Sequence, residues 1–339
     1  MLVLGIETTC DETAAAVVED GSKILSNIIF SQIHLHQKFG GVFPELASRS
    51  HVDKILLAID ESLKKANITL SDIDVIAVAN RPGLIGSVLI GLNAAKALSL
   101  SLKKPFIGIN HIEAHLYAAM MESINNLIFP ALGVVISGGH TKLLKILDIG
   151  KYEDIGTTID DAIGESFDKV ASILDLRYPG GPEVEKLAKL GDSTKYKFKA
   201  GKVDKNPFNF SFSGLKTKVL YTVKGQSSKK DFPTLIKEEE KKHIAAAFQK
   251  CAFDDLIKKC TLACSKFNLK AIYFGGGVTN NKTLREMFDK ENLNIDLFWP
   301  QKDLSLDNAA MIAGLGYHKF KKENKSDRLD ILAHPSCSF

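Results

Sequence analysis

Apolar runs alternate with short polar turns at the start of the chain. Met1 to Ile6 is apolar and leads into the polar stretch ETTCDET; the apolar run AAAVVED then precedes a turn at Gly21 and the run KILSNIIF. This pattern predicts three consecutive strands. Residues 131–150, ALGVVISGGHTKLLKILDIG, repeat the order of strand, small polar turn and strand. We therefore predict a duplicated domain.

The hydrophobic period changes between the two copies. Residues 43–66 have apolar side chains at helical spacing, at Ile55, Leu56, Ile59 and Leu63. A strand is predicted in SDIDVIAVANRPG, a small-residue helix in SVLIGLNAAKALSLSL, and a further strand in KPFIGIN. Strands that alternate with helices predict an α/β fold with a largely parallel sheet.

Later segments complete the predicted division of the chain. Residues 176–235 are rich in Lys, Gly and Pro with weak periodicity, and a helix is predicted over 241–267. The segment KAIYFGGGVTNN then predicts a strand that opens into a glycine-rich turn. We expect a first lobe over 1–127, a second over 128–325 with an elaborated basic segment at about 176–235, and a tail over 326–339.

Composition narrows the class of protein. The 339 residues are 45% hydrophobic and 25% charged, with a net charge of +4, which permits an anionic partner such as nucleic acid. The five cysteines are too sparse for a disulfide framework, so we expect a reducing compartment, the cytoplasm. Cys260 and Cys264 are better explained as buried thiols than as metal ligands. We expect no signal peptide, and no apolar run that approaches the ~20 residues of a membrane span.

Three polar turns are suited to an oxygen-rich ligand. SGGHT (137–141) suits an anion, ETTCDET (7–13) offers Glu7, Asp11 and Glu12 to a metal, a water or a proton, and FGGGVTNN (274–281) precedes a helix predicted near Lys282. Each turn alone is a weak signal, because such a stretch is more often a plain tight turn. Together with the duplication, they resemble the actin, sugar-kinase and heat-shock-chaperone ATPase superfamily. Neither the Walker pattern nor GxGxxG occurs.

The stretch HIEAH (111–115) places two histidines four residues apart. On a helix these side chains lie about 40° from each other and can converge on one ion. Glu113 lies about 200° around the helix from His111, so the zinc-protease pattern HExxH is not met. The alternative is that the histidines are ordinary core or surface groups.

Two imidazoles leave a metal site incomplete, so a carboxylate from elsewhere is expected. Asp307, in LSLDNAAMIAGLG, precedes a predicted small-residue helix and is our candidate. The alternative for Asp307 is a plain helix N-cap.

The motifs occur in the order found in one family. LGIETTCDET, GGVFPELASRSH, PGLIGSVLIGLNAAKALS, NHIEAH, ISGGHT, GESFDKVA, YPGGP, FSFSGLKT, FGGGVTNN and DNAAMIAGLG resemble tRNA N6-adenosine threonylcarbamoyltransferases from about residue 2 to about residue 320. The length resembles the bacterial branch of this family, which was formerly called O-sialoglycoprotein endopeptidase.

The resemblance implies an activity, a cofactor and partners. The threonylcarbamoyl group of threonylcarbamoyl-adenylate would pass to N6 of the adenosine 3′ of a tRNA anticodon, and AMP would leave. One divalent metal per subunit is implied, Fe(2+) first and Zn(2+) as the alternative. The implied partners are tRNA, an inactive paralogue of the same fold that pairs through the first domain, and a small P-loop ATPase; no membrane is implied.

The resemblance also implies site residues. Metal ligation is implied for His111, His115 and Asp307. Substrate contacts are implied for Val135, Ile136, Ser137, Gly138, Gly139, Asp168, Gly181, Glu185 and Asn281. We further expect Asp11 or Glu12 to accept the N6 proton or to position a water.

The chain departs from the family pattern at Arg81, where a glycine is usual before Pro82, and at Leu306, where a threonine usually precedes the aspartate. The segment KYKFKAGKVDKN (195–206) interleaves five lysines with Tyr196 and Phe198. It is either a solvated loop or a surface for tRNA phosphates. A small-molecule kinase or ATPase of the same superfamily is the alternative function, and a non-catalytic scaffold is another.

Overall fold

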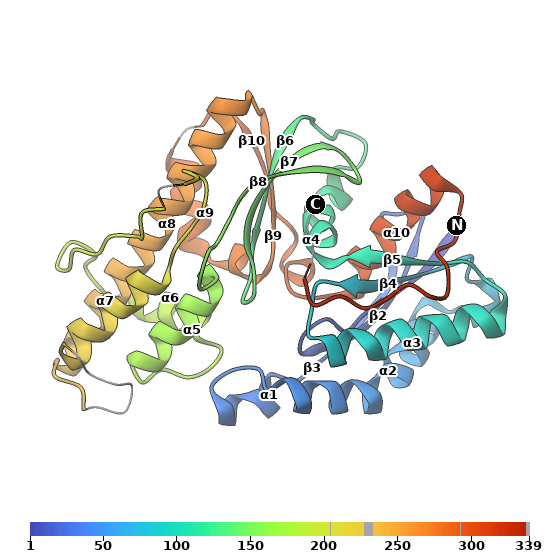
Figure 1. Cartoon of the computed structure of the whole chain (residues 1–339), viewed down its shortest axis with the longest axis horizontal. Helices are drawn as coiled ribbons and strands as arrows, with labels where there is room; N and C mark the ends of the chain where they lie inside the picture. The colour runs from blue at the N-terminus through green and yellow to red at the C-terminus, as the bar shows by residue number, and fades with distance from the viewer. Residues whose placement is uncertain (204, 227–232, 292, 337–339) are drawn as a thin grey trace. The chain divides into compact units, whose positions relative to one another are not determined.

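The computed structural model describes residues 1–203, 205–226, 233–291 and 293–336 (Figure 1). Cys337, Lys229, Lys230 and Asp204 of the lysine-rich segment therefore lie outside the described residues. Two compact units are formed, one from Met1–Leu127, Leu147–Tyr152 and Phe298–Phe339 and the other from Ile128–Ile146 and Glu153–Leu297. The lobes expected at 1–127 and 128–325 remain a prediction; the compact units differ chiefly in that residues 298–325 group with the first.

The first unit contains a mixed five-stranded sheet in the order β3-β2-β1-β4-β5. The predicted meander is present, because β1 pairs antiparallel with β2, and β2 with β3. Strands β4 and β5 then extend the sheet in parallel with β1. The strands are β1 (Leu2–Glu7), β2 (Glu12–Glu19), β3 (Lys23–Ser31), β4 (Val75–Arg81) and β5 (Phe106–Asn110).

Helices cover both faces of this sheet (Figure 1). Helices α2 and α3 pack on one face, and α10 packs on the other against β1, β2 and β4. The helices of the unit are α1 (Ile33–His36), α2 (Pro44–Ala66), α3 (Ile85–Leu102), α4 (His111–Met120) and α10 (Ala309–Glu323), with 3₁₀ turns at Gln37–Phe39, Leu70–Asp72, Met121–Ser123 and Lys302–Leu304.

Strand β1 contacts the two helical layers with alternate residues. Leu4 and Ile6 belong to the apolar core with α2 and α3, whereas Gly5 faces α10. A Cβ at Gly5 would overlap the carbonyl oxygen of Ala309, so only glycine permits this approach. The first turn of α10 therefore lies directly on β1, close to the polar turn that follows Glu7.

Helix α3 is the one helix of the described residues that is long and apolar enough to cross a membrane by length and composition, at 18 residues. This differs from the expectation that no apolar run approaches a span. The helix packs on β4 and α2, with Val88, Leu92 and Ala95 buried. Its composition is therefore accounted for in part by the core of the unit.

The second unit repeats the sheet. Its strand order is β10-β9-β6-β7-β8, with β6 antiparallel to β7 and parallel to β9. This is the order of the first sheet, which confirms the predicted duplication. The strands are β6 (Ala131–Ile136), β7 (Thr141–Asp148), β8 (Lys151–Thr157), β9 (Ala271–Gly275) and β10 (Asp296–Phe298).

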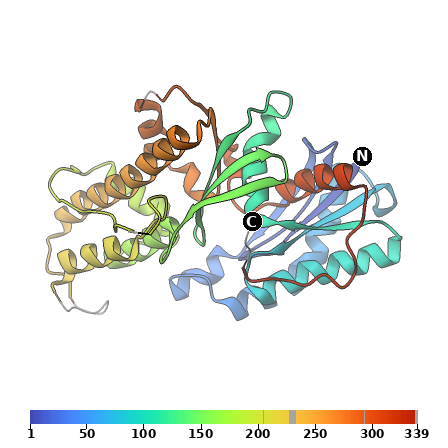
Figure 2. The same cartoon turned by 45° about the horizontal axis from the view of Figure 1, so that its top comes forward.

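Four helices of the second unit pack together, and α7 runs beside α8 (Figure 2). Helix α8 has the bounds predicted from periodicity. The segment 176–235 is more regular than expected, because it contains α6 and α7. The helices are α5 (Ile163–Ile173), α6 (Gly180–Ala188), α7 (Ser213–Lys224), α8 (Lys241–Phe267) and α9 (Lys282–Lys290), with 3₁₀ turns at Glu238–Glu240 and Gly277–Asn280.

Candidate functional site

The HIEAH motif forms the first turns of α4, as predicted. Strand β5 ends at Asn110, whose side chain accepts a hydrogen bond from the backbone N–H of Ile112 at 2.9 Å and caps the helix. His111 is 4% exposed and His115 is fully buried. Their rings lie 4.5 Å apart between centroids and at 78° to each other. Both rings are thus held on one face of α4.

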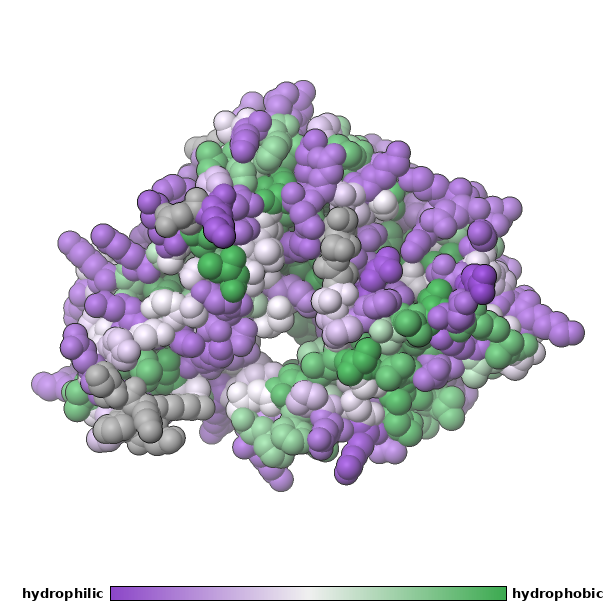
Figure 3. All heavy atoms as spheres, in the orientation of Figure 1, coloured by the Kyte–Doolittle hydropathy of each residue, from purple (hydrophilic) through white to green (hydrophobic). Residues whose placement is uncertain are grey.

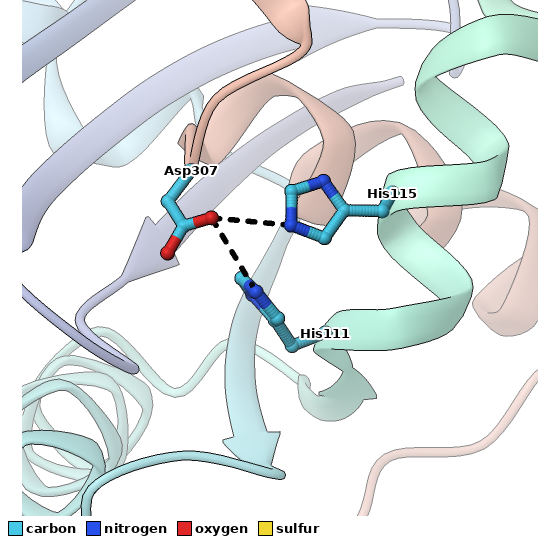
Figure 4. A group of neighbouring side chains, drawn as sticks. All are labelled: His111, His115 and Asp307. Carbon is cyan, nitrogen blue, oxygen red and sulfur yellow. Dashed lines mark hydrogen bonds and ion pairs between the residues drawn. The ribbon is translucent and has the colours of Figure 1, made fainter. Parts of the chain in front are cut away.

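Asp307 joins the two histidines within the first unit (Figure 4). Its Oδ1 lies 3.1 Å from Nε2 of His115 and 3.5 Å from Nε2 of His111. One ligand atom from each of the three residues lies within 4.8 Å of the other two. The residues that the sequence separates by nearly two hundred positions therefore present two imidazole nitrogens and a carboxylate to one point.

Asp307 is not the N-cap of α10, so the alternative interpretation of this residue is wrong. Asn308 occupies that position, and its side chain accepts a hydrogen bond from the N–H of Met311 at 3.0 Å. The side chain of Asn308 also donates to the carbonyl oxygens of Leu304 and Leu306. The cap thus fixes the segment that leads into the helix, and the carboxylate of Asp307 is directed to the histidines.

Glu7 supports His111 from the end of β1. Its Oε2 lies 2.9 Å from Nδ1 of His111, and the hydroxyl of Thr9 lies 3.2 Å from the same nitrogen. The other carboxylate oxygen of Glu7 accepts a hydrogen bond from the backbone N–H of Thr9. Glu7 is completely buried. Sequence reasoning counted it only among three acidic groups of the turn and did not foresee this contact.

The two histidines differ in their electrostatic surroundings. Burial lowers the pKa of His111, but the carboxylates of Glu7 and Asp307 outweigh burial and raise the pKa to about 9. Burial and the neighbouring His111 lower the pKa of His115, against an opposing effect of Asp307. The nitrogen Nδ1 of His115 finds no hydrogen-bond partner among the described residues. One ring is therefore held as a cation in the metal-free protein, and the other is neutral.

The donor set fits a divalent transition metal. Two imidazoles and one carboxylate are the ligands of non-haem Fe(II) sites and of catalytic Zn(II) sites, in which further coordination positions remain available. The Glu7–His111 contact has the form that supporting carboxylates take at such sites. The geometry is thus consistent with a metal site and does not distinguish iron from zinc.

Asp11 lies in the turn between β1 and β2, and Glu12 is the first residue of β2; both belong to the first unit and are buried. The hydroxyl of Ser31 donates to Glu12 at 3.3 Å. Burial raises the pKa of Glu12, and the negative charges of Asp307 and Asp11 raise it further. Glu12 is therefore a carboxyl group that takes up a proton more readily than an exposed glutamate.

His51 stabilises this turn and was not predicted. Its Nε2 donates to the carbonyl oxygen of Cys10 at 3.0 Å, and the hydroxyl of Thr13 donates to its Nδ1 at 2.8 Å. Burial lowers the pKa of His51, which favours the neutral ring. His51 lies within the buried stripe of α2, between Ala47 and Ile55, and a histidine at such a position requires buried partners.

Glu113 takes no part in the three-residue cluster. It is partly buried, and burial raises its pKa against the opposing charges of Lys319 and Arg81. A peptidase mechanism in which this glutamate activates a metal-bound water is therefore unsupported. The unusual Arg81 lies at the end of β4 near Glu113, and Leu306 is 50% exposed.

The turn SGGHT of the second unit is built for close backbone approach. Val135 and Ile136 end β6 and are buried. Ser137 closes the turn, because its N–H donates to the carbonyl oxygen of His140 at 2.8 Å and its hydroxyl accepts from the N–H of His140. Side-chain atoms at Gly138 and Gly139 would meet nothing within 4 Å. Both glycines are exposed among the residues that the structure describes.

Two further glycines hold this turn against its neighbours. A Cβ at Gly276, which has a φ of +93°, would strike the carbonyl of Ile136, and one at Gly164 would strike the carbonyl of Ser137. The predicted glycine turns at 137–141 and 274–281 are therefore adjacent in the second unit. In the sequence, each of these glycine-rich turns was by itself only a weak signal of a binding site.

The remaining predicted contact residues are also in the second unit. Asp168 accepts a hydrogen bond from the N–H of Gly180 at 2.7 Å, and a Cβ at Gly181 would meet nothing within 4 Å. Glu185 accepts from the N–H of Lys282 at 3.1 Å and pairs with Lys189. Asn281 caps α9 and donates to Gln249. These polar groups connect α5, α6 and α9, and their contacts to substrate stay a prediction.

Comparison with known proteins assigns the fold and the family. The family model described as tRNA N6-adenosine threonylcarbamoyltransferase matches residues 23–314. The chain is 58% identical over 331 residues to the protein of that name from Protochlamydia amoebophila (strain UWE25), over 98% of this chain and 96% of the relative.

Among solved structures, T. kodakarensis HypF is similar with a TM-score of 0.64 at 15% identity, over 95% of this chain and 48% of that one. A ROK family glucokinase from Streptomyces griseus gives 0.50 at 15% identity, over 93% and 98%. These likenesses confirm the expected fold. The chain belongs to the tRNA N6-adenosine threonylcarbamoyltransferase family.

Proposed function

We propose that this chain transfers the threonylcarbamoyl group of threonylcarbamoyl-adenylate to N6 of the adenosine 3′ of the anticodon in tRNA, with release of AMP. The observation that supports this most directly is the buried convergence of His111, His115 and Asp307 in a member of this family. A small-molecule kinase or ATPase would have no use for such a cluster.

The cluster holds one divalent metal, Fe(2+) in the first place and Zn(2+) as the alternative. Nε2 of His111, Nε2 of His115 and a carboxylate oxygen of Asp307 are the ligand atoms. The positive charge that a bound cation supplies stabilises the negative charge that develops on the oxygens of the mixed anhydride. Metal analysis of protein purified without added metal or chelator tests which metal is bound.

The residues of the β1–β2 turn accept the proton of the reaction. Attack of N6 on the carbamoyl carbon forms a C–N bond and breaks the bond from that carbon to the phosphate oxygen, and N6 loses one proton. Glu12 or Asp11 takes this proton, and the raised pKa of Glu12 increases the affinity of its ionised carboxylate for a proton. The electron pair of the broken bond leaves with AMP.

The second unit binds the adenylate. Val135 to Gly139 contact the phosphate and the threonylcarbamoyl group, and the exposed backbone N–H groups of Gly138 and Gly139 are the donors to the phosphate. Asp168, Gly181 and Glu185 contact the ribose, and Asn281 contacts the nucleotide. Asp168, Glu185 and Asn281 already make backbone or side-chain contacts, so each presents its remaining hydrogen-bonding capacity to the ligand.

The lysine-rich segment of the second unit binds tRNA phosphates. Lys195, Lys197, Lys199, Lys202 and Lys205 are all exposed. Tyr196 and Phe198 stack at 6.3 Å with an interplanar angle of 10°, and Tyr196 donates to Glu240. Exposed lysines can contact phosphates, and aromatic side chains between them can stack on bases. This arrangement favours a nucleic-acid surface over a plain solvated loop.

The outer surface of α2 and α3 binds the inactive paralogue. Hydrophobic side chains gather over these helices (Figure 3). The exposed ones are Val52, Leu56, Leu57, Ile85, Leu89 and Leu100. A contiguous apolar surface of this kind is typical of a protein interface. The small P-loop ATPase is a further partner implied by the family, and the cytoplasm is the expected compartment.

Reconstitution tests the activity. Purified protein, threonylcarbamoyl-adenylate and unmodified tRNA, with and without the paralogue, should yield equal amounts of threonylcarbamoyladenosine and AMP by mass spectrometry of nucleosides. Cells depleted of the protein should lose the modified nucleoside. An unchanged nucleoside together with phosphorylation of a small molecule would instead support the kinase.

A further inference from the structure

Glu7 is a buried carboxylate whose two oxygens are both engaged. Oε1 accepts the backbone N–H of Thr9, and Oε2 lies 2.9 Å from Nδ1 of His111. Within the described residues no lysine or arginine forms an ion pair with Glu7. A buried carboxylate is costly unless it is paired and hydrogen-bonded. The interaction with His111 therefore offsets the free-energy cost of burying the Glu7 carboxylate.

The two histidines of the cluster differ in the hydrogen-bond partners of Nδ1. Both lie on one face of α4 and both direct Nε2 to Oδ1 of Asp307. Nδ1 of His111 contacts Glu7 and the hydroxyl of Thr9, whereas Nδ1 of His115 finds no partner among the described residues. Burial at this helix face therefore does not by itself require a carboxylate behind the ring.

We infer that Glu7 is a positioning residue that makes His111 the firmly oriented ligand of the cluster. This role rests on the metal site proposed above. A carboxylate only accepts hydrogen bonds, so Nδ1 of His111 keeps its proton, and the proton that a metal would displace is the one on Nε2. The backbone N–H of Thr9 prevents the carboxylate from rotating away. Glu7 thus sets both the tautomer and the direction of the ring.

The substitution Glu7→Gln separates this role from a purely structural one. A glutamine keeps the size of the side chain but has one acceptor oxygen and one NH2 group. The amide oxygen can accept from the N–H of Thr9 or from Nδ1 of His111, but the two ends of the amide cannot accept from both groups at once, because one end is an NH2 donor. When the NH2 group faces His111, the ring must accept at Nδ1 and carry its proton on Nε2, the atom needed for the metal.

The measurement is the affinity of the folded protein for Zn(2+) and, anaerobically, Fe(2+), by competition with a chromophoric chelator. Loss of a supporting partner of this type lowers metal affinity about 10- to 100-fold, and we expect that loss for Glu7→Gln. Ser62→Ala is the control, because Ser62 is also buried in the first unit and, among the described residues, its hydroxyl donates to the carbonyl oxygen of Ile59 and not to the cluster. It should keep the affinity of the unaltered protein.

A second variant covers the case in which Glu7→Gln does not fold. Glu7→Asp keeps the negative charge but shortens the side chain by one methylene, so its carboxylate is withdrawn from Nδ1 of His111 and metal affinity should again fall, by about 10-fold. Unchanged affinity in folded Glu7→Gln, or in Glu7→Asp where the former does not fold, would overturn the role of Glu7 alone. Unaltered protein that binds neither metal would overturn the metal site as well.

Discussion

Asn308 caps helix α10, and the preceding residue, Asp307, directs its carboxylate to His115 at 3.1 Å. The two neighbours therefore have separable roles. Asp307→Asn should abolish stoichiometric metal binding and remove part of the stability that the charged His111 contributes to the metal-free protein below pH 9. Asn308→Ala should lower the free energy of unfolding by about 0.5–2 kcal/mol, the usual cost of a lost cap. Elemental analysis and urea unfolding distinguish them, and full metal content in Asp307→Asn would exclude it as a ligand.

Glu12 should matter for transfer and not for metal binding. Loss of a proton acceptor typically lowers the rate by about 10²–10⁴-fold, and this is the effect expected of Glu12→Gln under single-turnover conditions. The acceptor must be ionised, so the rate should rise with pH through the pKa of Glu12, which burial shifts above its usual 4.5. Asp11→Asn is the matched comparison. A Glu12→Ala protein with the full transfer rate would eliminate Glu12 from the reaction.

The charged His111 should make the metal-free protein less stable at alkaline pH. Its pKa rises from 6.5 to about 9 on folding, because Glu7 and Asp307 outweigh the opposing effect of burial. A raised pKa contributes stability that is complete below pH 6.5 and is lost as the pH rises through about 9. Urea unfolding of chelator-treated protein at pH 6.5, 8 and 9.5 should show this decline. In His111→Gln the decline should be smaller; an equal decline would assign it to other groups.

The sequence predicted the helices and residues of the site better than the contacts between residues that are distant in the chain. The spacing of His111 and His115 on a helix identified the pair, because helical period follows from local geometry. The bounds of α8 and the start of α9 after Asn281 were likewise local. Asp307 was a candidate ligand because it precedes a predicted helix, but the same position is typical of a helix cap, so the sequence pattern left both interpretations open. No local pattern placed Glu7 behind His111, because that contact depends on how β5 lies in the sheet relative to β1.

Gly5 should be required for the metal site although it touches no ligand. It allows the first turn of α10 to lie on β1, and Asp307 directly precedes that turn. Gly5→Ala should displace α10 and cost roughly 1–3 kcal/mol, as overpacking does, with a loss of metal affinity. Gly150→Ala is a control of low local crowding, although its positive φ adds some strain. Thermal unfolding and metal competition are the measurements. A Gly5→Ala protein with unchanged metal affinity would show that the close approach of α10 to β1 is not needed for metal binding.

The exposed lysines of the second unit should determine the salt dependence of tRNA binding. Each phosphate contact that is lost should lower the slope of log K against log salt by about 0.7–0.9, so Lys197→Glu and Lys199→Glu should each weaken binding and flatten the slope. Lys258→Glu makes the same change of charge at an exposed position of α8. It should alter the slope far less, because it lacks the stacked aromatic side chains beside Lys197. Filter binding of tRNA from 50 to 200 mM salt, the range over which such contacts are weakened, measures both effects. Equal losses in all three variants would show that net charge, and not the segment 195–206, governs affinity for tRNA.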